Sequence, residues 1–160
     1  MSQDKNRDWN QNRNRDWNQD RNQQSSTLKL NDSFFADMVR NGITPQFIED
    51  AEKYGDYLAN RVKLTTSQIR RIFGHVKKIE NFEDPKKFIP QLLMLKPMLA
   101  YTAKRNPEVT ALKEITDKAI EAVTSKEISN DKEKQLARFR LFCNGFEAIL
   151  AYHKAKGGRD

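Results

Sequence analysis

The 160-residue sequence has few of the residues from which active sites and metal sites are usually built. Its single cysteine, Cys143, excludes an internal disulfide. Its two histidines, His75 and His153, lack the ligand spacing of zinc or di-iron sites. Its six glycines form neither GxGxxG nor GxxxxGK[ST], so no phosphate-binding loop is predicted. We therefore expect no catalytic residue, no metal and no cofactor, and we do not expect an enzyme.

Long apolar runs are also missing. The densest apolar stretch, residues 92–99, is interrupted by Lys96 and Pro97, and is too short for a transmembrane helix. The N-terminal residues are polar and contain no signal-peptide core. Cys143 falls on an apolar helical stripe, which indicates packing in a reducing compartment. These features predict a cytoplasmic protein without a membrane partner.

The first 27 residues differ in composition from the rest. Asn, Gln, Asp and Arg dominate them, with Met1, Trp9 and Trp17 as the apolar exceptions, and the hexapeptide NRDWNQ occurs at residues 6–11 and 14–19. So little apolar surface cannot offset the entropy of ordering the segment. We expect residues 1–27 to be a disordered, dispensable leader, with a base-stacking or partner-binding tail as the alternative. Residues 28–160 then form one domain.

Within this domain the apolar residues recur at steps of three and four, and no strand pattern is present. Residues able to cap a helix N-terminus precede several of these periodic segments: Thr44, Thr65 or Thr66, Asp84, Asn106, and Asn130 or Asp131. The sequence predicts an all-α fold, a compact bundle of five main helices with a short sixth at residues 34–40. Pro90 and Pro97 predict a turn after Asp84, then a helix from about Pro90 with a kink near Pro97.

Positive charge is concentrated in one segment. Residues 61–105 contain eleven Lys or Arg and three acids, a local net charge of +8, whereas the whole chain has a formal net charge of +7. Such a concentration is typical of a surface that binds a polyanion, and the first candidate is nucleic acid. The predicted RNA-binding residues are Arg70, Arg71, Lys77, Lys78, Lys96, Lys104 and Arg105.

On a helical wheel of residues 66–80, Arg70, Arg71, Lys77 and Lys78 gather opposite the apolar side. Gly74 lies among them, although glycine costs a helix roughly 1 kcal/mol relative to alanine. A bare backbone where a phosphate could approach closely is one reason for it. The alternative is an ordinary solvated face. Tyr101 offers a ring for base stacking, although tyrosines at such positions are more often core.

The last predicted helix, about residues 131–155, is apolar nearly all round. Such a helix is central in a bundle or is covered by another chain, and Leu141 and Tyr152 are the candidates for contact with a neighbour. A partly buried ion pair between Arg140 and Glu147 is an alternative to exposed charges. His153 lies on the core side and is expected to be a buried, hydrogen-bonded histidine.

Three segments together resemble a known family: LTTSQIRRIF at residues 64–73, LKPMLAY at residues 95–101 and FEAILAYHKAKGG at residues 146–158. In order and spacing they are similar to the small subunit of type III-A CRISPR-Cas interference complexes, the small Csm subunit. The resemblance runs from about Leu28 to the C-terminus. The SQIRR and AYHK segments favour type III-A over the small subunit of the type III-B complex.

The resemblance implies a helical, non-catalytic subunit that packs in several copies along a ribonucleoprotein filament, near the guide RNA and its target. It makes Arg70, Arg71 and Lys96 candidates for RNA contact, and Glu147, Tyr152 and His153 candidates for packing or subunit contact. The partners it implies are RNA, other subunits of the complex and further copies of the chain. Two other hypotheses are a helical adaptor whose basic face is incidental or binds anionic lipid, and a metal-independent nuclease.

Overall fold

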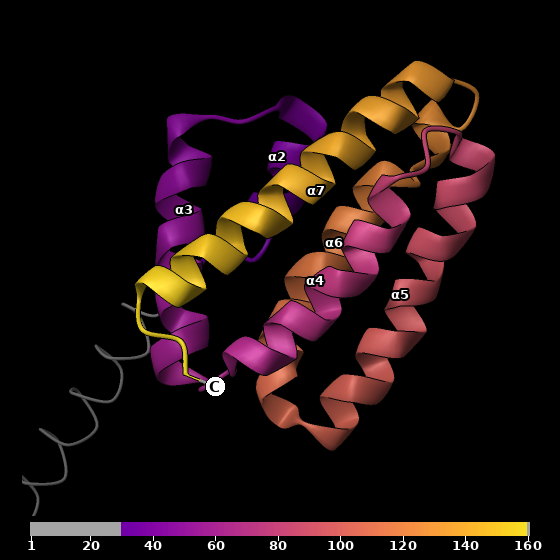
Figure 1. Ribbon diagram of the computed structural model, residues 1–160. Helices are drawn as coiled ribbons and strands as arrows, with labels where there is room; N and C mark the ends of the chain where they lie inside the picture. The colour runs from indigo at the N-terminus through magenta and orange to yellow at the C-terminus, as the bar shows by residue number, and fades with distance from the viewer. Residues whose placement is uncertain (1–29, 160) are drawn as a thin grey trace, which may run out of the picture. The chain divides into compact units, whose positions relative to one another are not determined.

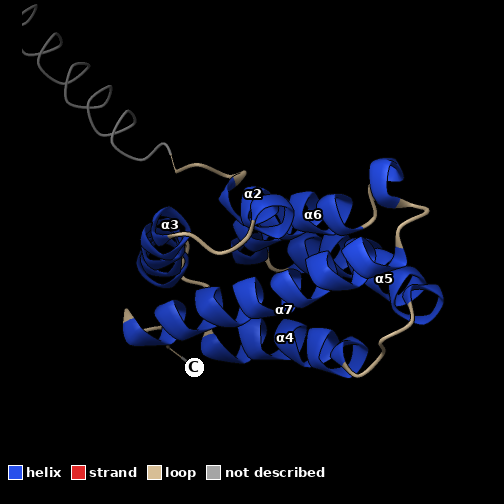
Figure 2. Cartoon of the chain, turned by 90° about the horizontal axis from the view of Figure 1, so that it is seen from above, coloured by secondary structure: helices blue, strands red, loops and turns tan. Residues whose placement is uncertain are grey.

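A computed structural model describes residues 30–159, and the predicted leader with its NRDWNQ repeats lies outside this range. The described chain is all-α, which confirms the predicted fold class (Figures 1 and 2). Its α-helices are α2 (Phe34–Asn41), α3 (Pro45–Asp56), α4 (Thr66–Glu80), α5 (Pro85–Arg105), α6 (Thr110–Val123) and α7 (Lys132–Ala155). A π-helical turn, Tyr57–Arg61, extends α3, and 3₁₀ turns at Pro107–Val109 and Lys126–Ile128 precede α6 and α7.

Side chains cap most of these helices as the sequence predicts. Thr44 accepts a hydrogen bond from the backbone N–H of Phe47, and Asp84 and Asp131 cap α5 and α7 in the same way. Thr65, rather than Thr66, forms a capping box with Gln68 at the start of α4. Asn106 makes no side-chain cap, because the chain enters the 3₁₀ turn there before α6 begins.

The prediction that a turn follows Asp84 and that the helix begins at about Pro90 is wrong. Helix α5 begins at Pro85 and continues through both prolines to Arg105. Each proline lacks the N–H that would bond the carbonyl four residues earlier, at Lys86 and Leu93 respectively. All four of these residues are exposed, so water can reach both carbonyls. The opposite side of the helix buries Phe88, Leu92, Leu95, Leu99 and Ala103, and this burial maintains the helix.

Helix α7 is the centre of the bundle. In Figure 2 it lies between α4 on one side and α2 and α6 on the other, and it contacts α2, α3, α4, α5 and α6. Three of its phenylalanines stack on three different helices. The ring centroids are 4.3 Å apart for Phe139 and Phe88 of α5, 5.3 Å for Phe142 and Phe35 of α2, and 5.7 Å for Phe146 and Phe73 of α4. The apolar perimeter of α7 is thus largely explained by the helices around it.

The segment after α7 crosses to the start of α4. The backbone N–H of Thr66, the first residue of α4, donates to the carbonyl of Arg159 (2.7 Å), and the Thr66 hydroxyl donates to the carbonyl of Gly158 (3.0 Å). Asn60 donates to the carbonyl of Lys156. The first N–H groups of a helix have no partner inside it, so the C-terminal segment completes the N-terminus of α4.

Candidate nucleic-acid interface

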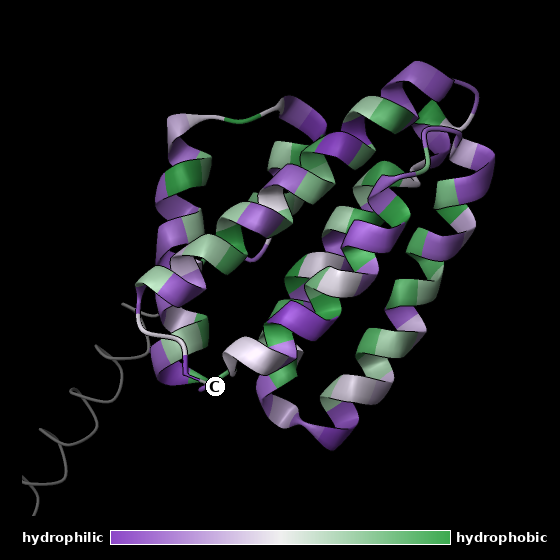
Figure 3. Cartoon of the chain, in the orientation of Figure 1, coloured by the Kyte–Doolittle hydropathy of each residue, from purple (hydrophilic) through white to green (hydrophobic). Residues whose placement is uncertain are grey.

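Helix α4 presents the predicted basic face. It buries Ile69, Ile72, Val76 and Ile79 against the core, and this leaves Arg70, Arg71, Lys77 and Lys78 exposed. Amphipathic alternation of this kind is visible around α4 and α5 in Figure 3. Because the helix is capped at Thr65 and packed along one whole side, the direction of these four cations is fixed by the fold.

Three of the four cations on α4 are free. Arg70, Arg71 and Lys78 form no ion pair with another described residue. Lys77 differs, because its Nζ lies 2.9 Å from a carboxylate oxygen of Glu80 and 5.4 Å from the ring centroid of Phe73. The hydrogen bond to Glu80 raises the pKa of Lys77. Lys77 is therefore already partly neutralised and offers less attraction to an anion than its neighbours.

Helix α5 runs antiparallel to α4 and adds to the same surface. Lys104 and Arg105 are exposed in its last turn, again without an ion pair to a described residue. Tyr101 is 64 % exposed, so the reading of this tyrosine as core is wrong. Arg71 of α4 and Tyr101, Thr102, Arg105 and Asn106 line one hollow of about 390 Å³. The fold thus joins two of the predicted RNA-binding residues, Arg71 and Arg105, from two helices, and places Tyr101 beside them.

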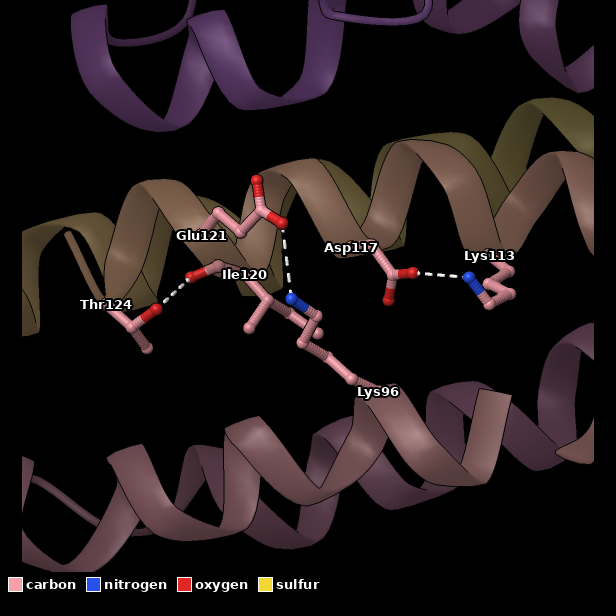
Figure 4. Close-up of polar contacts among 6 residues, drawn as sticks. All are labelled: Lys96, Lys113, Asp117, Ile120, Glu121 and Thr124. Atoms are coloured by element: carbon pink, nitrogen blue, oxygen red, sulfur yellow. Dashed lines mark hydrogen bonds and ion pairs between the residues drawn. The ribbon is translucent and has the colours of Figure 1, made fainter. Parts of the chain in front are cut away.

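Lys96 lies apart from this group. Its Nζ is 3.2 Å from a carboxylate oxygen of Glu121 on α6, and Figure 4 shows its side chain reaching from α5 towards that helix. Along α6, Lys113 and Asp117 form a second pair at 2.7 Å in the same view. Lys96 therefore forms an ion pair that joins α5 to α6, and it does not lie together with the cations of α4.

Gly74 is open. A Cβ atom built at this position meets no atom within 4 Å, so nothing inside the chain requires glycine there. Further along the same side of α4, where it faces α5, His75 and Lys78 border an apolar hollow of about 400 Å³ that Pro90, Met94 and Met98 help to line. Two hollows therefore lie along the boundary between α4 and α5: a polar one at the C-terminal end of α5 and an apolar one beside the middle of that helix.

The four interface candidates differ in exposure. Glu147 is exposed, Leu141 and Tyr152 are half-buried, and His153 is fully buried. The His153 Nε2 lies 2.6 Å from the carbonyl oxygen of Leu64, whereas its Nδ1 has no partner. The histidine is thus a core residue, as its position on the stripe predicts, and its buried side chain does not present a surface to a neighbouring subunit.

The alternative of a partly buried ion pair between Arg140 and Glu147 on α7 is wrong. Arg140 and Glu147 are both exposed, and these two described residues form no ion pair. Arg138 has a role that sequence reasoning missed, because its Nη1 donates to the carbonyl of Ala122 in the last turn of α6 (2.8 Å). The free carbonyls at a helix C-terminus favour cations. The sequence does not indicate, however, which arginine of α7 reaches the C-terminal carbonyls of α6.

Cys143 is buried and free. Burial, with a smaller effect of Glu80, raises the pKa of its thiol to about 12. A thiol that remains protonated is a poor nucleophile, so this cysteine is a packing residue, as predicted.

Across residues 30–159, the acidic, histidine and cysteine side chains form no group of three that could hold a metal ion. In the same range, no helix combines the length and the apolar character needed to cross a membrane.

Comparison with known proteins agrees with the resemblance seen in the three motifs. The family model described as Csm2 Type III-A matches residues 44–159. A protein of Streptococcus thermophilus named "CRISPR system Cms protein Csm2" is 29 % identical over 134 residues, which are 82 % of this chain and 98 % of that protein. No solved structure gives a significant match. The matched region contains α3 to α7, and thus the whole basic face, so the chain belongs to the Csm2 family, the small subunit of the type III-A CRISPR complex.

Proposed function

We propose that this subunit is a non-catalytic RNA-binding protein that contacts the sugar-phosphate backbone of guide or target RNA through the exposed side of α4 and the end of α5. The observation that carries the proposal is the row of exposed cations without an acidic partner: Arg70, Arg71, Lys78, Lys104 and Arg105. Exposed charges of one sign repel one another unless a polyanion neutralises them. A subunit of a CRISPR ribonucleoprotein encounters such a polyanion in RNA.

The contacts are independent of RNA sequence. Arginine and lysine on a convex helix reach phosphates, whereas sequence is read mainly by hydrogen bonds to base edges. In A-form RNA the major groove is deep and narrow, so the exposed side of α4 cannot reach the base edges there. Every RNA of the same length and strandedness should therefore bind with similar affinity.

The surroundings of Cys143 and of the two histidines support a non-catalytic role. Cys143 is buried with a raised pKa, and His153 is buried on the carbonyl of Leu64. His75 is exposed and has no acidic group placed to orient it among its hydrogen bonds or in the hollow beside it. A catalytic histidine or cysteine needs both access to substrate and a group that orients or activates it, and neither Cys143, His153 nor His75 has both.

The subunit associates with further copies through exposed apolar residues. On the described chain, exposed large apolar side chains occur on α5 (Leu93 and Met94) and near the start of α3 (Ile43 and Ile48). Met94 is the most exposed of them, at 67 %. A protein that packs in several copies needs such a surface, and its place on α5 keeps it beside the basic face.

The test of RNA binding is a charge reversal, Arg70→Glu, Arg71→Glu and Lys78→Glu together. If four or five phosphates are neutralised on single-stranded RNA, log K against log salt has a slope of about −3 to −3.5. Removing three contacts flattens the slope by about 2. The fold survives, because these side chains point into solvent.

A matched control is the reversal Lys132→Glu, Lys134→Glu and Lys154→Glu on α7, which changes the net charge equally at three exposed cations. We expect the control to bind RNA with a nearly unchanged slope. Equal weakening by both variants would mean that net charge alone drives binding. RNA binding that is insensitive to salt would favour the adaptor hypothesis. If the α4 charge reversal instead abolished binding to anionic vesicles and left RNA binding intact, anionic lipid would be the ligand of the basic face.

A further inference from the structure

The hollow at the end of α5 differs from the rest of the basic face, because it is concave and contains an aromatic ring. Arg71 contributes one wall from α4, and Tyr101, Thr102, Arg105 and Asn106 contribute the others. Its volume of about 390 Å³ falls within the range of ligand sites, which begins near 300 Å³. Lys78 of α4 also borders a hollow, but that one is lined mainly by apolar residues such as Met94 and Met98 and has no aromatic ring.

Tyr101 is held in place although it is exposed. The Arg105 guanidinium carbon lies 5.7 Å from the Tyr101 ring centroid, and Nη1 of Arg105 is 3.4 Å from the phenol oxygen. Tyr101 and Arg105 are one helical turn apart, so the two side chains lie together along α5. A cation beside the ring restricts its motion, and the ring makes no aromatic contact with another described residue. An exposed ring without such a contact is available for stacking.

The charges around the hollow favour an anion. Arg71 and Arg105 are both free of ion pairs with described residues. Glu108, which follows the hollow in sequence, accepts a hydrogen bond from Gln68 at 2.7 Å and does not line the hollow. The last carbonyls of α5 oppose an anion, but Lys104 and Arg105 in that turn compensate for them.

We propose that this hollow holds one unpaired nucleotide of the bound RNA, with its phosphate between Arg71 and Arg105 and its base stacked on Tyr101. The inference rests on the proposed function of the α4 surface and adds a preference for single-stranded RNA. A base inside an A-form duplex is stacked between its neighbours and does not reach the ring, whereas an unpaired base can be splayed onto it. Stacking is tolerant of base identity, so the subsite reads strandedness and not sequence.

The experiment compares Tyr101→Ala and Tyr101→Phe in the full chain. The probes are a ten-nucleotide oligo(U) and a blunt duplex of mixed sequence with the same number of base pairs. Stacking on one aromatic side chain is worth at least about 1 kcal/mol, so Tyr101→Ala should weaken oligo(U) binding roughly fivefold or more. It should leave duplex binding unchanged. Tyr101→Phe retains the ring and should bind oligo(U) almost as the native chain does.

A second readout locates the base. Oligo(U) with 5-iodouridine substitutions, irradiated in the complex, should cross-link to the peptide that contains Tyr101, identified by mass spectrometry. Three results overturn the subsite. These are equal weakening of single-stranded and duplex binding by Tyr101→Ala, loss of binding in Tyr101→Phe, and a cross-link confined to another helix.

The two proposals fail in different ways. If Tyr101→Ala has no effect while the α4 charge reversal still weakens binding, the subsite is wrong and the α4 surface stands. If neither variant affects binding, the proposed RNA surface itself is wrong. Because Tyr101 is 64 % exposed, the alanine variant should retain its melting temperature, so weaker binding can be distinguished from a loss of folding.

Discussion

Replacing Gly74 by alanine tests stability and RNA contact in one variant. A Cβ at this position meets nothing within 4 Å, so the substitution adds no clash. Alanine is favoured over glycine inside a helix by roughly 1 kcal/mol, and the free energy of unfolding should rise by about that amount. Unfolding entropy is about 2.1 cal/mol/K per residue, so for the roughly 130 described residues the melting temperature should rise by about 4 °C.

The same methyl group should weaken RNA binding if a phosphate approaches the backbone at Gly74. Moving one phosphate from about 4 to about 5.5 Å from a cation costs roughly 1 kcal/mol at an effective dielectric constant of about 20. This corresponds to about fivefold in affinity. Alanine carries no charge, so the salt slope should stay the same while affinity falls at every salt concentration. Thermal unfolding and fluorescence anisotropy over a salt series measure both effects.

The matched variant is Gly55→Ala in α3. A Cβ there lies 2.6 Å from Cβ of Tyr152 and 2.8 Å from the backbone nitrogen of His153, where α3 meets α7. Both glycines gain the same helix propensity, but Gly55→Ala must separate two helices, and overpacking of this kind typically costs about 1 to 3 kcal/mol. Its melting temperature should fall. If Gly74→Ala is destabilised, the space around Gly74 is not empty. If it binds RNA with unchanged affinity, no phosphate approaches the backbone at Gly74.

Two further predictions concern Cys143 and the contact between copies. Burial raises the pKa of Cys143 and of Tyr54 to about 12, above ordinary values of 9.0 and 10.0, so the unfolded chain loses these protons first. Stability should be full below about pH 9 and fall as the pH rises towards 12, more gently in Cys143→Ala, which thermal unfolding from pH 8 to 11 can measure. Met94→Glu should lower self-association in light scattering without lowering the melting temperature, since the side chain is 67 % exposed. Leu141→Glu with Tyr152→Glu should instead destabilise the half-buried face of α7. If the variant with both α7 substitutions folds but is monomeric, the contact between copies lies on α7 and not on α5.

The parts of this fold that local sequence determines were predictable. Thr65 and Gln68 mark the start of α4, and the step of three and four that places Ile69, Ile72 and Val76 together also fixes the opposite, basic face. These signals act within one helix and need no knowledge of its neighbours. The same reasoning correctly placed α7, whose capping residue and apolar stripe are both local.

The errors arose where tertiary contacts overrode local preference. Pro90 and Pro97 break an isolated helix, yet in α5 the burial of residues such as Phe88 and Leu92 outweighs two missing hydrogen bonds whose carbonyls face water. The core alternative for Tyr101 is wrong, because this residue lies on the exposed side of α5, beside Arg71 of another helix. The bond from Arg138 to Ala122 and the pairing of Lys96 with Glu121 depend on how helices meet, which periodicity does not specify.

The junction between Thr66 and Arg159 has a consequence for the order in which the protein matures on the ribosome. Helix α4 is synthesised early, but the carbonyl that bonds its first N–H belongs to residue 159, and the helix on which Phe73 stacks spans Lys132–Ala155. The cations of α4 therefore leave the ribosome well before the contacts that orient them exist. A nascent chain carries the charge of the proposed RNA-binding surface without its shape, and that shape is completed only after residue 159 has been added.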